Sequence, residues 1–563
     1  MTRTRRLGFV VALLALVTAP SRAQGTRAAP SPADLIVVNA RIYTADAARP
    51  IVDAIAVRAG RIVFAGDVAG ARALAGNATR VVDAGGRAVI PGMTDAHAHV
   101  LGLGDKLQSV DLVDTRSYDE VIARVAARAR TTPKGQWILG RGWDQNDWGD
   151  TRWPSHEALS RAVPDHPVML TRVDGHAVLV NAAAMRLANL TRSTASPAGG
   201  EILKSDAGEP IGVLVDNAEN IVARVIPAPT RAQMKEMIKS AIVEMHRWGL
   251  TGVHDAGASA TTLELYEELG RENALNIRLY AMISDHAPTL DAWFRRGPLV
   301  GAFDGTLWVR SLKLYQDGAL GSRGAALLEP YSDDARTSGL LVSPAEHIRD
   351  VASRALAAGF QVNTHAIGDR GNRLVLDSYE AALRARPTAD HRFRVEHAQI
   401  LHSDDIPRFA ALGVIPSMQA SHQTSDMYWA GNRLGQGRLL GAYAWRSLLA
   451  TNVVIPNGSD FPVEHVNPVI SYKASVARQD ARNWPVGGWF PEQRMTRDEA
   501  LLSMTLWPAY AAFQEAELGS LTPGKRADFV ILSQDIMRVP TEVLQDTQVI
   551  STWVSGRLVY ERR

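Results

Sequence analysis

The feature that most constrains this chain is a long alternation of short apolar runs with helix-like stretches. Four amphipathic stretches cover residues 232–248, 344–358, 373–386 and 403–412. The apolar runs are eight in number: 87–90, 249–254, 276–283, 309–315, 359–363, 393–396, 413–417 and 453–456. Eight buried strands that alternate with helices predict an α/β fold of the (β/α)₈ TIM-barrel type.

The first two runs are separated by an interval, about residues 108–247, that is too long for one crossover. We therefore expect an insertion there. This segment is rich in tryptophan, with Trp137, Trp143, Trp148 and Trp153 close together. Such a cluster suits an apolar or aromatic ligand, but tryptophans also simply fill cores.

Both ends of the chain have a different texture, with short alternating segments separated by glycines. These segments are 35–38, 54–57 and 61–64 near the start and 527–532, 549–554 and 557–560 near the end. The pattern is typical of antiparallel strands, which pair into a small domain when both ends come together. We expect residues 34–90 and 511–563 to form a β-sandwich, and residues 91–510 to form the catalytic barrel.

Residues 1–25 read as a signal peptide. Arg3, Arg5 and Arg6 precede an apolar run over 7–19, and Ala23 offers a small residue for cleavage. The run is too short to span a bilayer comfortably, so we expect no stable membrane span after cleavage. The expected location is the periplasm or the medium. An uncleaved anchor is the alternative, and Arg5-Arg6 only partly matches a twin-arginine signal.

Composition excludes several partners and ligands. The chain has 563 residues and a formal net charge of +2, which sets up no field for nucleic acid. It has no cysteine, so disulfides, thiolate metal ligands and a cysteine nucleophile are all excluded. Any metal must be held by histidine, carboxylate or modified lysine. Nothing in the sequence fixes the oligomeric state, although homodimers are the commonest soluble oligomers.

The stretch PGMTDAHAH at 91–99 places His97 and His99 two residues apart after an apolar run. In a strand, residues i and i+2 point to the same face, so the two imidazoles can hold one metal ion. An isolated pair of this kind is more often one surface histidine and one buried, hydrogen-bonded histidine. The rest of the chain has to decide.

Polar residues follow several of the other runs at the end where barrel chemistry occurs. Lys313 lies within the fourth run, His365 follows the fifth, His397 follows the sixth and Asp460 follows the eighth. Each has an ordinary alternative, such as a snorkelling lysine, a satisfied core histidine or a loop cap. Their ordered occurrence at successive strand ends favours a shared metal site.

The chain resembles the amidohydrolase superfamily, in the amidohydrolase-3 branch that contains N-substituted formamide deformylase and YtcJ-like proteins. The motifs that carry the resemblance are PGMTDAHAH, LKLYQDGALGSRGAAL, THAIGDRGN, VEHAQ, NGSDFP and GSLTPGKRADFVIL. It covers about residues 34–563, and as a set these motifs are highly specific. The family has a metal-dependent (β/α)₈ barrel with a β-sandwich built from both chain ends, in agreement with the patterns above.

The resemblance implies a set of ligands for each of two divalent ions. His97 and His99 would bind one with Asp460, and His365 and His397 would bind the other. Lys313, carboxylated by CO₂, would bridge them. A carbamate supplies negative charge and two oxygens where a free ammonium would repel the cations, and its formation needs a neutral amine, which burial favours. Ligands of this kind suit zinc, with manganese, iron and cobalt left open.

On that basis the expected reaction is hydrolysis of a non-peptide C–N bond in a small amide-type molecule. A metal-activated hydroxide would attack the carbonyl carbon, and Asp460 would act as general base and then general acid. Formamides, N-acyl amino acids, cyclic amides and esters remain open as substrates. Residues proposed to contact the substrate are Trp143, Asp144, His176 and Arg323, and His422 and His465 are weaker candidates for the barrel mouth.

Two other functions remain open. With Lys313 unmodified, the site would be mononuclear, as in deaminase-like amidohydrolases. A non-catalytic periplasmic protein that binds metal or ligand would also keep the ligand residues, and turnover would separate it from an enzyme. A glycosidase barrel fits poorly, because the strand ends are rich in histidine rather than in paired carboxylates.

Overall fold

Eight parallel strands run around the centre of the molecule in chain order. The computed structural model describes residues 31–150, 152–172, 177–197 and 200–563, so the predicted signal peptide lies outside the described residues. The strands are β8 (Met93–Ala98), β15 (Leu250–Ala258), β16 (Arg278–Ser284), β18 (Leu307–Tyr315), β19 (Gln361–Ala366), β20 (Arg394–His397), β21 (Ile415–Gln419) and β22 (Asn457–Gly458). The predicted α/β barrel is therefore confirmed.

The ring closes between its last and first strands through backbone hydrogen bonds. The amide of Asp460 donates to the carbonyl of His97 at 2.7 Å, and the amide of His99 donates to the carbonyl of Phe461 at 2.8 Å. Gly458 lies so close that a Cβ there would be 2.5 Å from the amide nitrogen of His97. The hydrogen bonds that close the barrel therefore hold the predicted ligands His97 and His99 next to Asp460.

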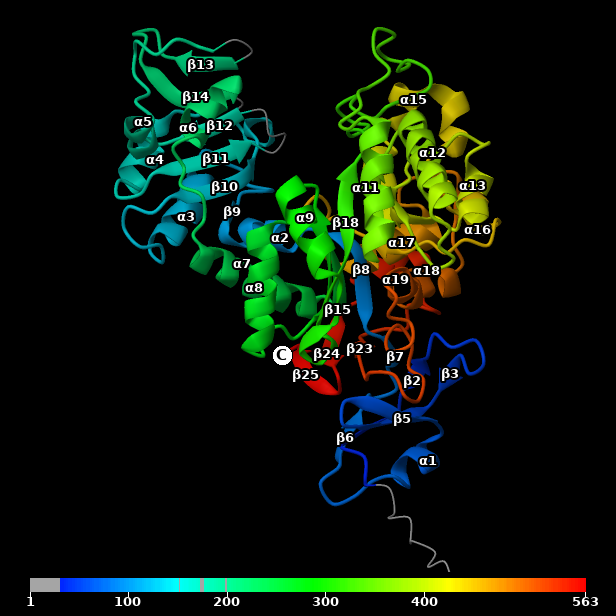
Figure 1. Ribbon diagram of the computed structural model, residues 1–563. Helices are drawn as coiled ribbons and strands as arrows, with labels where there is room; N and C mark the ends of the chain where they lie inside the picture. Colours follow the sequence, from blue (N-terminus) through cyan, green and yellow to red (C-terminus); the bar gives the residue numbers. More distant parts are fainter. Residues whose placement is uncertain (1–30, 151, 173–176, 198–199) are drawn as a thin grey trace, which may run out of the picture.

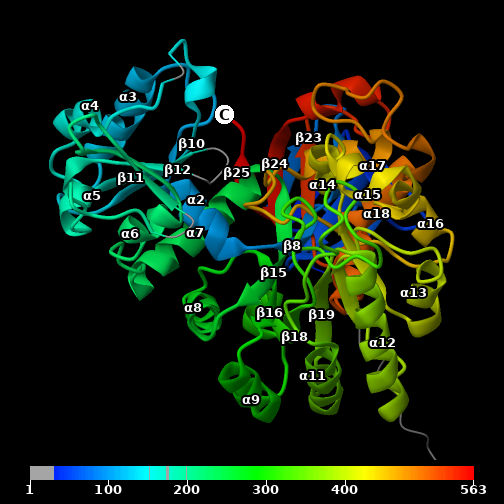
Figure 2. The same ribbon diagram turned by 90° about the horizontal axis from the view of Figure 1, so that it is seen from above.

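Helices cover the outside of the barrel and follow the strands. They include α8 (Ala260–Arg271), α9 (Ala287–Arg296), α11 (Ala345–Ala358), α12 (Asp369–Ala385) and α13 (Ile406–Leu412). Seen from above, these helices follow one another in chain order from α8 to α13 along one side of the strands (Figure 2). α12 shows why they form: its apolar residues recur every three or four positions, and Val375, Leu376, Tyr379 and Ala382 are buried.

Two of the eight predicted strand positions are wrong. Residues 88–91 form β7 (Ala88–Pro91), which belongs to the terminal sheet, and the first barrel strand begins at Met93. Gly92 makes the transition, because a Cβ there would lie 2.1 Å from the hydroxyl of Thr251. The eighth strand is Asn457–Gly458, after the predicted run 453–456. β8 carries the polar residues Asp95 and His97, and β22 consists of Asn457 and Gly458, so in both places the apolar run lies next to the strand and not within it.

The long interval between the first and second barrel strands forms a separate lobe (Figure 1). Its sheet has the order β13-β14-β12-β11-β10-β9. The strands are β9 (Val110–Asp111), β10 (Ile138–Trp143), β11 (Val168–Arg172), β12 (Ala177–Val180), β13 (Gly200–Lys204) and β14 (Pro210–Asp216), with α3 (Tyr118–Ala129), α4 (His156–Ala162) and α5 (Ala182–Leu187). It leaves the barrel after α2 (Val100–Gln108) and returns through α7 (Arg231–Arg247), and these two helices pack on each other.

The two ends of the chain meet at the bottom of the view in Figure 1, where the blue and red strands lie together. One sheet has the order β5-β4-β1-β6, and the other has the order β25-β24-β23-β7-β2-β3. The strands are β1 (Leu35–Val38), β2 (Arg41–Tyr43), β3 (Ile51–Val52), β4 (Ala54–Arg58), β5 (Arg61–Gly66), β6 (Arg80–Asp83), β23 (Phe529–Leu532), β24 (Val549–Val554) and β25 (Arg557–Glu561). Val37 and Ile55 of one sheet share a buried cluster with Val89 and Phe529 of the other.

A buried ion pair joins this terminal domain to the barrel. The guanidinium of Arg278 on β16 donates to both carboxylate oxygens of Asp528, at 2.8 and 3.0 Å. Both side chains are almost fully buried. Among the described residues, no helix combines the length and the apolar character needed to cross a bilayer.

Candidate metal centre

The predicted ligands converge at the carboxyl ends of the barrel strands. His97 and His99 lie at the end of β8, Lys313 lies on β18, His365 lies on β19 and His397 ends β20. Asp460 follows β22. Ligand atoms of His97, His397 and Asp460 all lie within 4.8 Å of one another, and the three residues are buried. The structure thus brings together side chains that are more than 360 residues apart in the sequence.

Short distances link the remaining members to this group. Asp460 Oδ1 lies 3.6 Å from His97 Nε2 and 3.0 Å from His99 Nε2. Lys313 Nζ lies 3.0 Å from His97 Nε2. The ring centroids of His365 and His397 are 4.5 Å apart, and those of His97 and His397 are 4.8 Å apart. All six predicted ligands therefore line one small volume.

Burial sets the protonation of the group. It lowers the pKa of His97 and His397 well below the usual imidazole value and that of His365 to about 3, and the Lys313 charge adds to the effect on His97 and His365. Neutral imidazole is the form that binds a metal ion. Burial also lowers the pKa of Lys313 to about 8, although Glu396 and Asp460 oppose this shift.

Asp460 behaves in the opposite way to an ordinary buried carboxyl group. Burial alone would raise its pKa, but the hydrogen-bonding contact of His99 and the nearby histidines hold the pKa well below its usual value. The carboxylate therefore stays ionised among neutral imidazoles. This combination of one anion with several neutral nitrogen donors is the donor set that divalent zinc prefers.

The group fits a metal ion because some of its buried donor atoms have no hydrogen-bond partner among the described residues. These atoms include His365 Nε2, Asp460 Oδ1 and His422 Nε2. An unpaired buried polar atom costs about 1–3 kcal/mol, so such atoms rarely collect in one place without a ligand. His365 Nε2 lies 3.6 Å from Asp317 Oδ1, whereas a cation held by His97, His397 and Asp460 would satisfy Asp460 Oδ1.

Two contacts on the side away from the metal site orient the rings of His97 and His397. Glu396, which is fully buried, contacts His97 Nδ1 and forms an ion pair with Arg394 Nε at 2.7 Å. Gln419 Oε1 lies 2.7 Å from His397 Nδ1. In each case the outer nitrogen is occupied, so the other ring nitrogen faces the site. This arrangement is common around metal-binding histidines.

Two further carboxyl groups brace the loops that carry the ligands. Asp95 accepts hydrogen bonds from the hydroxyl and amide of Ser459 and from the amide of His97, which joins β8 to the segment that carries Asp460. Asp317 accepts from the amides of Ile367 and Gly368, next to His365. Burial raises the pKa of both Asp95 and Asp317 to about 7.

The metal group forms the floor of a cavity of about 400 Å³. Beyond the six predicted ligands, the cavity is lined by Tyr315, Ala319, Leu320, Gly321, Ile367, Gln399, His422, Ser425, Asp426, Trp429, Val463 and Glu464. The wall is therefore partly apolar and partly acidic. Apart from the lysine of the metal group, no lysine or arginine lines it among the described residues.

The three predicted substrate contacts that the structure describes do not join this lining. Trp143 is fully buried in the core of the lobe, where its indole nitrogen donates to the carbonyl of Leu170, so a packing role replaces the predicted one. Asp144 pairs with Arg172 in the same lobe. Arg323 pairs with Asp333. His176 lies outside the described residues.

Of the weaker candidates, His422 lines the cavity, whereas His465 packs against Trp248 with ring centroids 5.1 Å apart. Sequence reasoning also missed Glu396, Arg394 and Gln419. One signal was available for the first two: charged residues occupy alternate positions of the fully buried strand Arg394–His397. A charged pair inside such a strand indicates a buried network.

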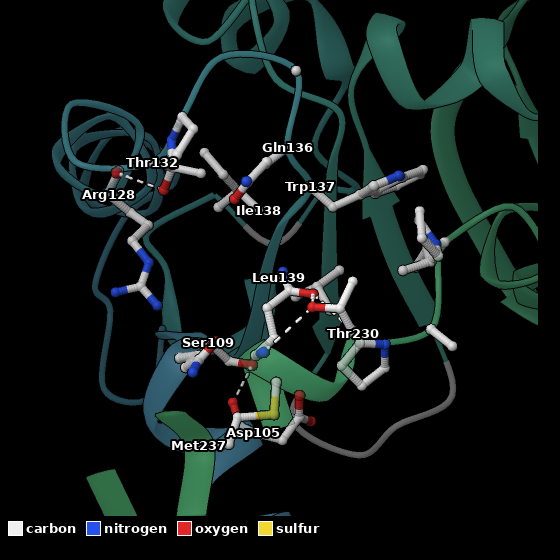
Figure 3. Close-up of a pocket in the computed structure, with 18 of the residues that line it drawn as sticks. Asp105, Ser109, Arg128, Thr132, Gln136, Trp137, Ile138, Leu139, Thr230 and Met237 are labelled. Carbon is white, nitrogen blue, oxygen red and sulfur yellow. Dashed lines mark hydrogen bonds between the residues drawn. The ribbon is translucent and has the colours of Figure 1, made fainter. Parts of the chain in front are cut away.

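A second cavity, of about 450 Å³, lies where the lobe joins the barrel (Figure 3). Asp105 and Ser109 come from the end of α2 and its continuation, Trp137 and Leu139 from the start of the lobe sheet, and Thr230 from the return segment. None of the predicted metal ligands reaches it. Its hydroxyl groups are used locally, as in the bond from Thr132 to the carbonyl of Arg128.

Comparisons with known proteins find relatives over most of the chain. The model of the "Amidohydrolase family" matches residues 80–560. The chain is 34% identical to Protein LONG AFTER FAR-RED 3 of Arabidopsis thaliana, over 94% of this chain and 92% of that protein. It is 29% identical to the N-substituted formamide deformylase of Arthrobacter pascens, over 94% and 98%.

A solved structure is also similar. An uncharacterized metal-dependent hydrolase from Pyrococcus furiosus has a TM-score of 0.74 and 30% identity, over 90% of this chain and 100% of the other. The resemblance predicted from the motifs, to the branch with YtcJ-like proteins and N-substituted formamide deformylase, is confirmed. With its barrel, its His/His/Asp group and its match over most of its length, the chain belongs to the amidohydrolase family.

Proposed function

We propose that this protein hydrolyses a non-peptide C–N bond in a small amide-type substrate, with divalent metal ions at the barrel mouth. The observation that carries the proposal is the convergence of His97, His397 and Asp460 within 4.8 Å at the floor of a cavity. The formamide deformylase among its relatives supports a C–N bond as the target. Family membership alone gives neither the C–N bond as the target nor the divalent metal ions, and the experiments below test each of them.

Two ions, of which zinc is the favoured metal, are proposed from the donor set. His97, His99 and Asp460 would hold one ion, His365 and His397 the other, and a carbamate on Lys313 would join them. When bound, such ions polarise a carbonyl group and lower the pKa of water to about 7. The lowered pKa of Lys313, about 8, supports the carbamate, because only a neutral amine reacts with CO₂.

The protein's own residues supply the proton transfers and the surroundings. Asp460, held ionised by its histidine neighbours, would accept a proton at a carboxylate oxygen and deliver it to the departing nitrogen. Tyr315, Leu320 and Trp429 line the cavity and would exclude water around the bond. A drier site strengthens each charge interaction within it.

A mononuclear site is the second candidate, and one observation favours it. His97 and Asp460, assigned to one ion, lie within 4.8 Å of His397, assigned to the other, so one ion can reach all three. In that case Lys313 would remain an unmodified amine. Elemental analysis decides between the two: one metal per chain with unmodified lysine supports the mononuclear site.

Turnover tests the enzyme itself. We expect the metal-loaded protein to release amine from a panel of N-substituted formamides and other amides. The Asp460→Asn variant should lose this activity while it keeps much of its metal. A protein that binds metal but turns over no amide in such a panel would instead be a non-catalytic binding protein, which is the alternative of a different class.

We further propose that the protein is exported. The support is the basic and apolar sequence of residues 1–25 alone. Mass measurement of the protein from its native host gives the test. Cleavage near Ala23 and recovery from the periplasm or medium support export, whereas an intact Met1 in the cytoplasm contradicts it. The proposed homodimer is tested on the same sample by light scattering.

A further inference from the structure

We propose that His422 and the face of α14 (Ala420–Asp426) around it form the subsite for the amine half of the substrate, with His422 Nε2 accepting the N–H of the scissile bond. This inference rests on the proposed function, since it assigns a role within the same cavity. His422 lines that cavity, and its Nε2 atom is buried without a hydrogen-bond partner among the described residues.

The position of His422 relative to Asp460 gives the subsite its direction. Asp460 Oδ1 faces His97 and His99, at 3.6 and 3.0 Å. Asp460 Oδ2 lies 3.8 Å from His422 Nε2. One oxygen of the carboxylate thus faces His97 and His99, and the other faces His422.

That geometry leaves room for one substrate atom between the two groups. A nitrogen about 2.9 Å from both Asp460 Oδ2 and His422 Nε2 forms a triangle whose third side is their 3.8 Å separation. The carbonyl oxygen belongs on the other side, with the cation ligands, because a metal polarises oxygen. The nitrogen that receives a proton from Asp460 therefore lies beside His422.

The helix places other groups on the same face. His422 and Asp426 are four residues apart on α14 and both line the cavity, as does Trp429, which follows the helix. Gln419, three residues before His422, contacts His397. The His422 ring is also nearly parallel to that of His397, with centroids 5.9 Å apart. The N-terminal end of the helix is fixed by a bond from the amide of Ala420 to Asn457.

The charge of this wall suits an amine product. Asp426 accepts a hydrogen bond from Gln399 Nε2 at 2.9 Å and another from the hydroxyl of Tyr443. Glu464 accepts from the hydroxyl of Ser425 at 2.7 Å. Both carboxyl groups line the cavity outside the ligand set. An alkylamine is protonated at neutral pH, so this wall stabilises the leaving group, while it disfavours a substrate with a carboxylate on its amine half.

The test compares an amide with its ester. N-benzylformamide offers an N–H at the scissile bond, and benzyl formate has the same shape without it. His422→Phe keeps a ring beside His397 but removes both nitrogens. We expect His422→Phe to lower kcat/KM for the formamide by about tenfold or more, the effect of losing one buried hydrogen bond, and to leave the ester within about threefold. His422→Gln, which restores an acceptor, should recover part of the loss.

Matched controls separate this role from others. His402→Phe replaces a half-exposed histidine outside the cavity lining and should leave both substrates unchanged. An equal loss on amide and ester would overturn the proposal, since it indicates a contact to the carbonyl oxygen. Loss of metal from His422→Phe would overturn it as well, because it makes His422 a ligand. Unchanged kinetics on both substrates would also refute it.

A binding measurement tests the amine subsite independently of the proposed reaction. We expect benzylammonium to bind the metal-loaded wild-type protein more tightly than benzyl alcohol, and His422→Phe, like Glu464→Gln, to weaken that binding in calorimetry. If the wild-type protein hydrolyses neither substrate but shows this pattern, the proposed reaction fails and the amine subsite stands. If it hydrolyses the amide but shows no preference for the ammonium, the amine subsite fails alone.

Discussion

Glu396 contacts the Nδ1 atom of His97 and leaves the Nε2 atom of the same ring facing Asp460 at 3.6 Å. Arg394 pairs with Glu396 from behind, and its guanidinium also donates to the carbonyl of Ala96 on β8. The strand that supplies one histidine ligand, β20, therefore orients a histidine of another strand, β8.

This relationship predicts a loss of metal affinity rather than of fold in the Glu396→Gln variant. Glutamine keeps the size of the side chain, but its amide cannot hold the His97 ring as a carboxylate does. We expect the affinity for the metal to fall about 10–100-fold. Titration of the metal-free protein with zinc measures it, and Glu380→Gln on the outer helix α12 is the control. Equal affinity in wild-type and Glu396→Gln protein would contradict the role.

For the Asp460→Asn variant we expect a loss of activity and not a loss of metal. The amide oxygen still reaches the metal group, but the side chain no longer accepts a proton. We expect kcat to fall about 10²–10⁴-fold, the usual contribution of general acid–base catalysis, while metal content stays near that of the wild type. Amine release and elemental analysis on the same preparation measure both quantities. Retained activity would remove Asp460 from the proton path.

Lys313 predicts a pH dependence of stability in the metal-free protein. Its pKa is about 8 in the fold against 10.5 in the unfolded chain, so between these values the unfolded state binds more protons. The free energy of unfolding therefore gains from this residue as pH rises through that window, by about 3 kcal/mol in total. Urea unfolding of wild-type and Lys313→Met protein measures it from pH 7, below the lower pKa, to about 9.5, which lies between the two pKa values.

The free energies of unfolding of the two proteins should converge as pH rises. At the lower pH the wild type must bury a charged Lys313, and the Lys313→Met protein has no such charge to bury. Lys239→Met, on a lysine paired with Glu236 at the surface, is the control and should follow the wild type. Parallel curves for wild-type and Lys313→Met protein would show that Lys313 keeps an ordinary pKa.

The pair of Arg278 and Asp528 predicts a large structural effect far from the site. Asp528→Ala leaves a buried guanidinium without its partner, which typically costs about 3–5 kcal/mol. We expect a lower unfolding midpoint and little change in metal content per folded chain. Calorimetric unfolding measures the first quantity. A midpoint within a degree or so of the wild type would show that the domains do not depend on this pair.

The sequence predicted the barrel well because its strands are buried on both faces and its helices are amphipathic. The run 309–315 became Leu307–Tyr315, and the stretch 344–358 became α11. It failed at the first and last strands for one physical reason. Met93–Ala98 carries Asp95 and His97, and the last strand is only Asn457 and Gly458, so burial in these strands is not matched by apolar character.

The site was predictable only in part. His97 and His365 could be found because each follows or ends a strand in the chain order of the barrel. Glu396 and His422 could not be assigned, since their roles depend on contacts to residues about 300 and 40 positions away. Trp143 shows why an aromatic motif alone does not separate a ligand contact from packing, since in the structure it lies in the buried core of the lobe.

The metal content of each chain is the decisive measurement for this site. Protein prepared with bicarbonate is analysed for zinc, manganese, iron and cobalt, and the peptide that contains Lys313 is weighed under conditions that preserve a carbamate. We expect two metal ions per chain and a lysine heavier by one CO₂, with both ions reduced in His97→Asn and His397→Asn proteins. Absence of bound metal from every preparation of the wild-type protein would contradict it.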